Sequence, residues 1–211
     1  MKKLKEFARN NWQLLLNIYI FLNIAGYCVW SGYRTWQEGR FDFVEVSFTV
    51  QNLLMLAFIL LRRKHKALNR NFLHQAVALF AFFSGLLFIG QEATGSASAQ
   101  SVSSWTIFIS NILGAITLLN LGRSFGILIA FRKVKTGGLY SIVRHPMYGT
   151  DILLRIGFII SHYSPFTLAL FTVSTGAYVV RALLEERFLL QEPEYQEYAK
   201  RVRYRFIPFV F

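Results

Sequence analysis

A short run of residues from Gly138 to Tyr148 carries the kinds of side chain that bind and position a charged ligand. It ends in Arg144-His145-Pro146-Met147-Tyr148, directly before an apolar stretch, so the proline stands where a helix begins. A helix start offers N–H groups to an anion such as a carboxylate, and His145 and Tyr148 add a donor and an aromatic face. The plainer interpretation is a helix start without a ligand. A polar cluster at the edge of an apolar stretch indicates chemistry at a membrane surface.

Two charged pairs follow this turn. Arg181 and Glu185 are four residues apart, so they share one helix face where the apolar stretch ends. Asp151 and Arg155 have the same spacing, acid first, but lie inside the apolar stretch. Charged side chains at membrane depth are costly and face a cavity or each other. For both pairs a structural ion pair remains the alternative to ligand binding.

The composition places these residues in a membrane protein. The chain has 211 residues, of which 54% are hydrophobic and 17% aromatic, and its mean hydropathy is +0.38, too apolar for an ordinary soluble domain. The net charge of +12 is concentrated between the apolar stretches, as expected beside anionic lipid rather than nucleic acid. The single cysteine, Cys28, excludes a disulfide framework. The histidines outside the turn, His65, His74 and His162, are too scattered to predict a metal site.

The apolar stretches predict an all-α, polytopic fold with five membrane-embedded elements. Four stretches are near the length that crosses a hydrocarbon core of roughly 30 Å: residues 12–30, 43–61, 72–90 and 105–121. The fifth, residues 146–184, is long enough for two passes and is interrupted by polar residues at 161–165, which predicts a helical hairpin. Residues 95–104 read as a short outside loop, and Trp12, Trp30 and Trp105 as interfacial anchors.

Basic residues predict the orientation. They crowd the N-terminal segment, residues 62–71, residues 122–145 and the C-terminal tail, whereas the intervening connections are nearly free of them. By the positive-inside rule both termini and the candidate site are cytoplasmic, in the plasma membrane if the source is bacterial or archaeal. We expect one structural domain with a four-helix region, residues 1–121, and a ligand-binding region, residues 122–211.

Several motifs in residues 120–211 resemble the isoprenylcysteine carboxyl methyltransferase family of integral-membrane enzymes. They are Leu121-Gly122-Arg123, Val134-Lys135-Thr136-Gly137-Gly138-Leu139-Tyr140, the Arg-His-Pro-Met-Tyr turn, Arg181 with Glu185-Glu186, the stretch Glu194-Tyr195-Gln196-Glu197-Tyr198, and Ile207-Pro208. The order and spacing of these motifs, more than any single one, carry the resemblance.

The resemblance implies a methyltransferase that uses S-adenosylmethionine. It implies a cofactor site under the cytoplasmic tail, formed by Arg132, Lys133, Val134, Lys135, Tyr140, His145, Pro146, Met147, Tyr148 and Glu185. Arg181 matches the position that approaches the methyl acceptor and would orient an acceptor carboxylate. Because a sulfonium is already a strong methyl donor, transfer depends on placement and desolvation more than on a base. An amine or phenol acceptor would also need a proton acceptor, and no candidate for it is obvious.

Membrane lipids and a lipidic or amphipathic acceptor are the expected partners, with neither nucleic acid nor metal. Asp151 and Arg155 are assigned to substrate binding; they stand where the prenylcysteine enzymes are apolar, which disfavours a farnesyl-cysteine acceptor. Two alternatives remain. Sterol-reductase-like membrane enzymes, which use NADPH, share a similar turn and a Tyr-Arg-x-x-Pro ending, here Tyr204 to Pro208. A non-enzymatic subunit or transporter is disfavoured because the polar residues gather on one side rather than at mid-membrane.

Overall fold

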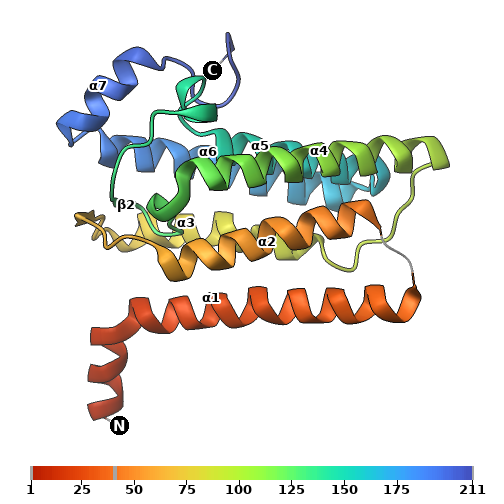
Figure 1. Cartoon of the computed structure of the whole chain (residues 1–211), viewed down its shortest axis with the longest axis horizontal. Helices are drawn as coiled ribbons and strands as arrows, with labels where there is room; N and C mark the ends of the chain where they lie inside the picture. Colours follow the sequence, from red (N-terminus) through yellow and green to blue (C-terminus); the bar gives the residue numbers. More distant parts are fainter. Residues whose placement is uncertain (1, 40–41, 211) are drawn as a thin grey trace.

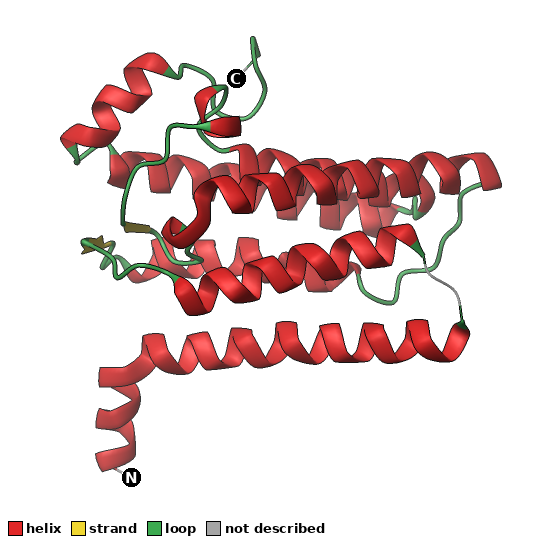
Figure 2. Cartoon of the chain, in the orientation of Figure 1, coloured by secondary structure: helices red, strands yellow, loops and turns green. Residues whose placement is uncertain are grey.

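A computed structural model describes residues 2–39 and 42–210, with side chains described from Leu15 onward apart from residue 38. The regular structure of the described chain is almost all helical, joined by loops (Figures 1 and 2). Its α-helices are α1 (Lys2–Glu38), α2 (Phe43–Leu61), α3 (Phe72–Phe83), α4 (Ala97–Leu121), α5 (Pro146–Ser161), α6 (Pro165–Leu189) and α7 (Pro193–Arg201). Short 3-10 turns are η1 (Ser84–Phe88), η2 (Gly122–Ser124) and η3 (Gly138–Ser141). The two strands are β1 (Ala67–Leu68) and β2 (Ala130–Phe131).

Within the described residues, four helices are long and apolar enough to cross a membrane, which confirms the all-α, polytopic fold class. The candidate spans are Leu15–Gln37, Phe43–Leu61, Ala97–Ser124 and Pro165–Leu189. Many large apolar side chains on these helices are exposed, for example Leu22, Leu60 and Val173. Exposure of this kind suits surfaces that face lipid, because lipid tails solvate apolar side chains as well as a protein core does. The predicted anchors Trp30 and Trp105 are also exposed, whereas the side chain of Trp12 lies outside the described residues.

The predicted hairpin of α5 and α6 is confirmed, and the sequence explains where each helix begins. Pro146 and Pro165 each stand in the first turn of their helix, where a missing N–H costs no hydrogen bond. Ser164 forms a capping box with Thr167: the Ser164 hydroxyl accepts from the Thr167 N–H at 3.0 Å, and the Thr167 hydroxyl accepts from the Ser164 N–H at 2.8 Å. The polar break therefore restarts the chain as a new helix.

Three predicted boundaries are wrong. Helix α4 begins at Ala97 rather than Trp105, because the Ser96 side chain caps it; most of the predicted outside loop 95–104 is therefore helical. Helix α1 continues to Glu38, well beyond Trp30. The third stretch is α-helical only to Phe83 and then tightens into η1, so it forms a shorter apolar element over Phe72–Phe88.

The basic connections lie at one end of the helices (Figure 1). The connection after α2 contains β1, and the connection after α4 contains β2. The two strands form an antiparallel pair with Ala67 opposite Phe131, which joins the two connections. At the opposite end, the N–H groups of Thr94 and Gly95 both donate to the carbonyl of Ser161. The turn before α5, the end of α6 and helix α7 therefore meet on the same side as the basic connections.

Candidate functional site

A cavity of about 630 Å³ lies among the helices and under α7. Its walls come from α1, α2, α3 with η1, the connection after α4, α5, α6 and α7. Every predicted site residue except Pro146 lines it: Arg132, Lys133, Val134, Lys135, Tyr140, His145, Met147, Tyr148, Asp151, Arg155, Arg181 and Glu185. Pro146 is buried at the start of α5. The predicted site residues, which lie between Arg132 and Glu185 in the sequence, therefore line one cavity.

The cavity has a polar part, called its polar end below, and walls that are mainly apolar. The polar end contains the charged and tyrosine side chains that come from residues 132–151 and from α6 and α7. The remaining walls are mainly apolar and come from α1, α2, α3 and η1: Ile20, Ile24, Phe48, Met55, Phe82, Phe83, Leu86, Phe88 and Ile89. Such a space accommodates a molecule with a polar head and an apolar tail.

Tyr148 and Glu185 connect the start of α5 to the end of α6. The Tyr148 hydroxyl donates a hydrogen bond to the Glu185 carboxylate. The guanidinium of Arg181 lies over the Tyr148 ring, 5.1 Å from its centroid, a distance at which a cation is attracted by the ring face. The two helix ends that the sequence placed at one surface are thus in direct contact.

Arg181 is 4% exposed and is held by the main chain. Its Nη1 donates to the carbonyl of Ala78 on α3 at 3.0 Å, and its Nη2 donates to the carbonyl of Ile127 at 2.7 Å. Among the described residues its Nε is buried without a hydrogen-bond partner. Both arms of the guanidinium fork, which the sequence analysis assigned to an acceptor carboxylate, are therefore already occupied by backbone carbonyls.

His145 is buried and neutral. Burial lowers its pKa to about 3, and the positive charges of Arg144, Arg205 and Arg181 add to that effect. Its ring stacks on Tyr148, with centroids 5.4 Å apart and planes 9° apart. Its Nε2 is one of the buried side-chain atoms that lack a partner in the described part of the chain. The imidazole therefore brings an unused polar atom to the cavity wall.

The helix start itself offers less to an anion than the sequence suggested. The N–H groups of Tyr148 and Gly149 both donate to the carbonyl of His145, at 3.1 Å each. Positive charge at this end of the cavity comes instead from side chains. Arg132 is buried, and desolvation lowers its pKa to about 10, helped by Arg62; it therefore remains a cation at neutral pH.

The basic connection is held in place by Gln75, which the sequence analysis missed. Gln75 Nε2 donates to the carbonyls of Asn69 and Ile129, at 2.7 and 3.0 Å, and Gln75 Oε1 accepts from the Ile129 N–H at 3.0 Å. One amide side chain thus connects α3 to residues that directly adjoin both strands. A buried glutamine in an apolar helix is the signal that could have identified it, because such a group must be hydrogen-bonded.

The C-terminal tail covers the polar end through ion pairs and tyrosines. Glu186 is buried between Arg144 and Arg205, at 2.8 and 2.6 Å, so this network joins the start of α5, the end of α6 and the tail. Tyr195 and Tyr198 of α7 line the cavity, and the Tyr198 hydroxyl donates to the carbonyl of Tyr140 at 2.7 Å. Burial raises the pKa of Tyr140 and of Tyr198, so both remain neutral phenols.

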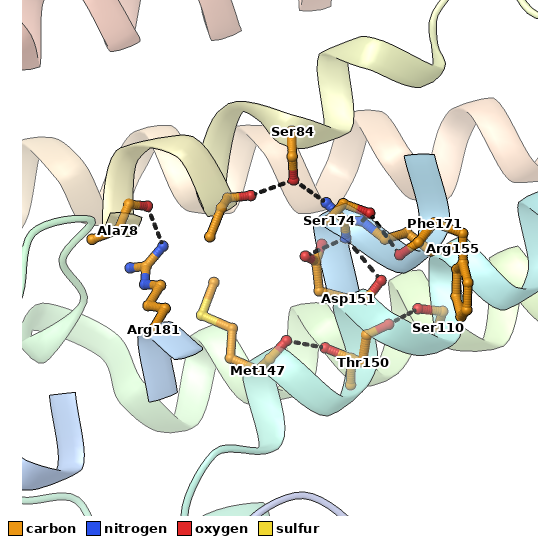
Figure 3. Close-up of polar contacts among 11 residues, drawn as sticks. Ala78, Ser84, Ser110, Met147, Thr150, Asp151, Arg155, Phe171, Ser174 and Arg181 are labelled. Carbon is orange, nitrogen blue, oxygen red and sulfur yellow. Dashed lines mark hydrogen bonds and ion pairs between the residues drawn. The ribbon is translucent and has the colours of Figure 1, made fainter. Parts of the chain in front are cut away.

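The predicted pair of Asp151 and Arg155 forms deeper along α5 (Figure 3). Arg155 Nη1 lies 2.5 Å from Asp151 Oδ2, and its Nη2 and Nε donate to the hydroxyls of Ser84 and Ser174, at 3.1 and 3.2 Å. Its guanidinium is also 4.7 Å from the ring centroid of Tyr178. The pair is therefore self-neutralising, as the structural alternative expected, and it also faces the cavity.

No group of three potential metal-ligating side chains occurs in the described residues. His74 Nδ1 lies 3.0 Å from Asn69 Nδ2, and His162 stacks on Phe158 with centroids 4.0 Å apart. His74 and His162 thus have structural contacts of their own.

Comparison with known proteins identifies similar chains for the second half of this one. The model of the phospholipid methyltransferase family matches residues 97–196. Protein-S-isoprenylcysteine O-methyltransferase B of Arabidopsis thaliana is 32% identical over 104 residues, which are 46% of this chain and 53% of that protein. A probable protein-S-isoprenylcysteine O-methyltransferase of Oryza sativa subsp. indica is 26% identical over 112 residues, 49% of this chain and 58% of that protein.

A reductase is also similar. Delta(14)-sterol reductase TM7SF2 of Mus musculus is 34% identical over 86 residues, which are 38% of this chain but 20% of that protein. This chain spans somewhat more than half the length of the methyltransferases that it matches. The comparisons confirm the resemblance to the isoprenylcysteine carboxyl methyltransferase family over about half of the chain, and the phospholipid methyltransferase model matches a segment that includes most of the predicted site residues.

Proposed function

We propose that this protein is an integral-membrane methyltransferase that transfers a methyl group from S-adenosylmethionine to a lipidic or small amphipathic acceptor. One observation carries the proposal: residues selected for cofactor binding from separate parts of the sequence line a single cavity, and Tyr148 and Glu185 meet there. The similarity to methyltransferases over residues 97–196 supports it.

The residues at the polar end fit the chemistry of this cofactor. Its carboxylate would be held by the cations of residues 132–135, and its cationic groups by Glu185. Tyr148 and His145 stack on each other and line the cavity, and the buried, unpartnered Nε2 of His145 offers a polar atom to the adenine. When bound, the cofactor supplies an activated methyl group on a positively charged sulfur. The protein's part is to orient that group and to exclude water, which α7 does by covering this end.

The apolar walls support an acceptor with a hydrocarbon tail. The wall residues of α1, α2 and η1 belong to helices whose outer faces are also apolar, so a tail would remain in apolar surroundings as it enters from the bilayer. Asp151 and Arg155 stand between the polar end and the apolar walls and would contact the acceptor's head, as would the Nε of Arg181. The catalytic region would comprise residues 122–211, supported by residues 1–121, with the cavity's polar end and both termini in the cytoplasm.

A reductase that uses NADPH is the second candidate. The 34% identity with a sterol reductase favours it, but that similarity covers a fifth of the reductase, whereas the similarity to the methyltransferases covers more than half of theirs. A non-enzymatic subunit or transporter is disfavoured because the polar lining residues gather on one side of the helices rather than at mid-membrane.

Titration of the purified, detergent-solubilised protein with each cofactor separates these functions. Isothermal calorimetry with S-adenosylmethionine, with its demethylated product and with NADPH should show saturable binding of the first two and none of the third. Binding of NADPH alone would favour a reductase over a methyltransferase. Binding of neither cofactor would favour the non-enzymatic alternative.

A further inference from the structure

A ladder of polar side chains extends from the covered end of the cavity into the apolar layer. On α6, Ser174, Tyr178, Arg181 and Glu185 follow one another at spacings of four, three and four residues, so they form one stripe along the helix. On α5, Tyr148, Asp151 and Arg155 do the same. Of these residues, Tyr148 and Glu185, which are assigned to the cofactor, lie nearest the covered end. Asp151 and Arg155 lie further along α5, within the apolar layer.

Asp151 is the inner of the two carboxylates that line the cavity, and its side chain is partly accessible. Among the described lining residues of the cavity, the acidic ones are Asp151 and Glu185. Glu185 receives the hydroxyl of Tyr148. Asp151 is bound at one oxygen by Arg155, also accepts a hydrogen bond from the Tyr178 hydroxyl, and still has a side chain that is 29% exposed. Asp151 lies three residues after Tyr148, on the same face of α5. A head group beyond the cofactor residues would therefore reach the Asp151 carboxylate first.

Neither Arg155 nor Arg181 has two free guanidinium N–H groups with which to bind a carboxylate. Arg155 is 2% exposed, and its three nitrogens donate to Asp151, Ser84 and Ser174. Both Nη atoms of Arg181 donate to backbone carbonyls, as Figure 3 shows for Ala78. A carboxylate acceptor beside Asp151 would meet a negative charge and find no free guanidinium fork, so only the overall positive charge of the cavity would favour it.

An amine acceptor is disfavoured by the charge of the walls. The described lining residues include six cations, Arg132, Lys133, Lys135, Arg144, Arg155 and Arg181, and two carboxylates. The resulting field disfavours an incoming ammonium ion, but it stabilises negative charge that develops on oxygen.

We propose, on the basis of the function above, that the methyl acceptor is a hydroxyl group, alcoholic or phenolic, on a lipid-like molecule, and that Asp151 accepts its proton. The acceptor oxygen forms a bond to the methyl carbon while the carbon–sulfur bond of the sulfonium donor breaks, and the electron pair stays on the sulfur. The O–H proton passes to the Asp151 carboxylate and then to water. Arg155 positions that carboxylate and compensates its charge within the apolar layer.

The test uses acceptors that share one alkyl chain and differ only in the head: a 4-alkylphenol, a 4-alkylbenzoic acid and a 4-alkylbenzylamine. The wild-type protein should methylate the phenol in preference to both others. Asp151→Asn should lower kcat for the phenol by about 10²- to 10⁴-fold, the usual contribution of a positioned base, and should leave the affinity for S-adenosylmethionine unchanged. Asp151→Asn should also weaken binding of the alkylphenol to the cofactor-free protein, a readout independent of turnover.

Acceptor acidity separates a base from a structural residue. A ring-fluorinated alkylphenol that is already ionised at the assay pH needs no proton acceptor, so Asp151→Asn should methylate it at close to the wild-type rate. If Asp151→Asn does not fold, Asp151→Asn with Arg155→Gln removes both charges together and keeps the apolar layer neutral. Equal loss for ionised and neutral phenols, or preference of the wild type for the benzoate or the amine, would overturn the inference. Absence of S-adenosylmethionine binding in the wild type would instead overturn the proposed function.

Discussion

The Tyr148 hydroxyl donates a hydrogen bond to the carboxylate of Glu185. The two residues are 37 positions apart and stand at opposite ends of a helical hairpin, so their contact closes the hairpin on the side of the basic connections. It also leaves the rest of the Glu185 carboxylate facing the cavity. This relationship makes Glu185 the position at which the cofactor proposal is most easily tested.

Glu185→Gln should weaken the binding of S-adenosylmethionine by about tenfold or more. The change keeps the shape but removes the charge, and a hydrogen bond to a charged group contributes roughly 1.5–3 kcal/mol. Calorimetric titration measures the effect. Glu197→Gln is the matched control, because Glu197 is exposed and pairs with Lys200 on the surface of α7. Equal affinity of the two variants for S-adenosylmethionine would show that Glu185 has a purely structural role.

Arg181→Lys should lower both the stability and the turnover of the protein. An ammonium group cannot donate to the carbonyls of Ala78 and Ile127 in the geometry of the guanidinium fork. Loss of one of these charge-assisted bonds costs roughly 1.5–3 kcal/mol, so the midpoint of thermal unfolding should fall by several degrees. Turnover should fall more than cofactor affinity, because Arg181 stands beside the acceptor's head. A variant with unchanged unfolding and normal turnover would contradict both assignments.

The Gly138→Ala variant should disrupt the turn before the Arg-His-Pro-Met-Tyr segment. Gly138 has a φ of +60°, and a Cβ there would lie 1.4 Å from Asn120 Oδ1, the atom that accepts the Leu139 N–H at 3.0 Å. The neighbouring Gly137→Ala is the control, since nothing lies within 4 Å of its Cβ position. Thermal unfolding and cofactor affinity should both suffer in the first variant and remain near wild type in the second.

Acidification should destabilise the protein partly through His145. Its folded pKa is lowered to about 3 from an ordinary value of 6.5, so the unfolded chain binds a proton more readily. The stability due to neutral His145 is complete above pH 6.5 and is lost as the pH falls from 6.5 toward 3, by at most roughly 1.4 kcal/mol for each pH unit. His145→Gln should flatten this dependence between pH 7 and 5 in thermal unfolding. Parallel curves for the two proteins would show that His145 does not contribute.

Cysteine labelling tests the proposed orientation. Cys28→Ser removes the natural thiol, and Lys64→Cys or Ser98→Cys then places a reporter at either end of the helices. A membrane-impermeant maleimide should label Ser98→Cys from outside intact cells and should label Lys64→Cys only after the membrane is opened. The reverse pattern would invert the topology.

Much of the architecture could be predicted because helix length and basic residues are local properties of the sequence. Helix α2 was predicted at its observed bounds, and so was the break between α5 and α6. The start of α4 was misplaced because Ser96 caps a helix whose first turns are polar, and hydropathy does not detect a cap. The tightening after Phe83 was also missed, since it depends on tertiary packing.

The residue types of the candidate site could be predicted, but their hydrogen-bond partners could not. The sequence predicts that Tyr148, Glu185 and Arg181 lie at one surface. From their spacing of four residues it also predicts a contact between Arg181 and Glu185. In the structure Arg181 binds carbonyls from α3 and from the connection after α4, and Glu185 binds Tyr148. Those partners come from distant segments, so helical spacing carries no information about them. Gln75 was missed for the same reason.

The central claim is tested most directly by following the methyl group. Membranes containing the protein are incubated with S-adenosylmethionine labelled in its methyl group, and the label in the organic extract is measured for the wild type and for Glu185→Gln. Label should enter extractable lipid with the wild type and should fall by at least tenfold with the variant at subsaturating cofactor. Extracts without label above the protein-free control, together with oxidation of NADPH by the same membranes, would contradict it.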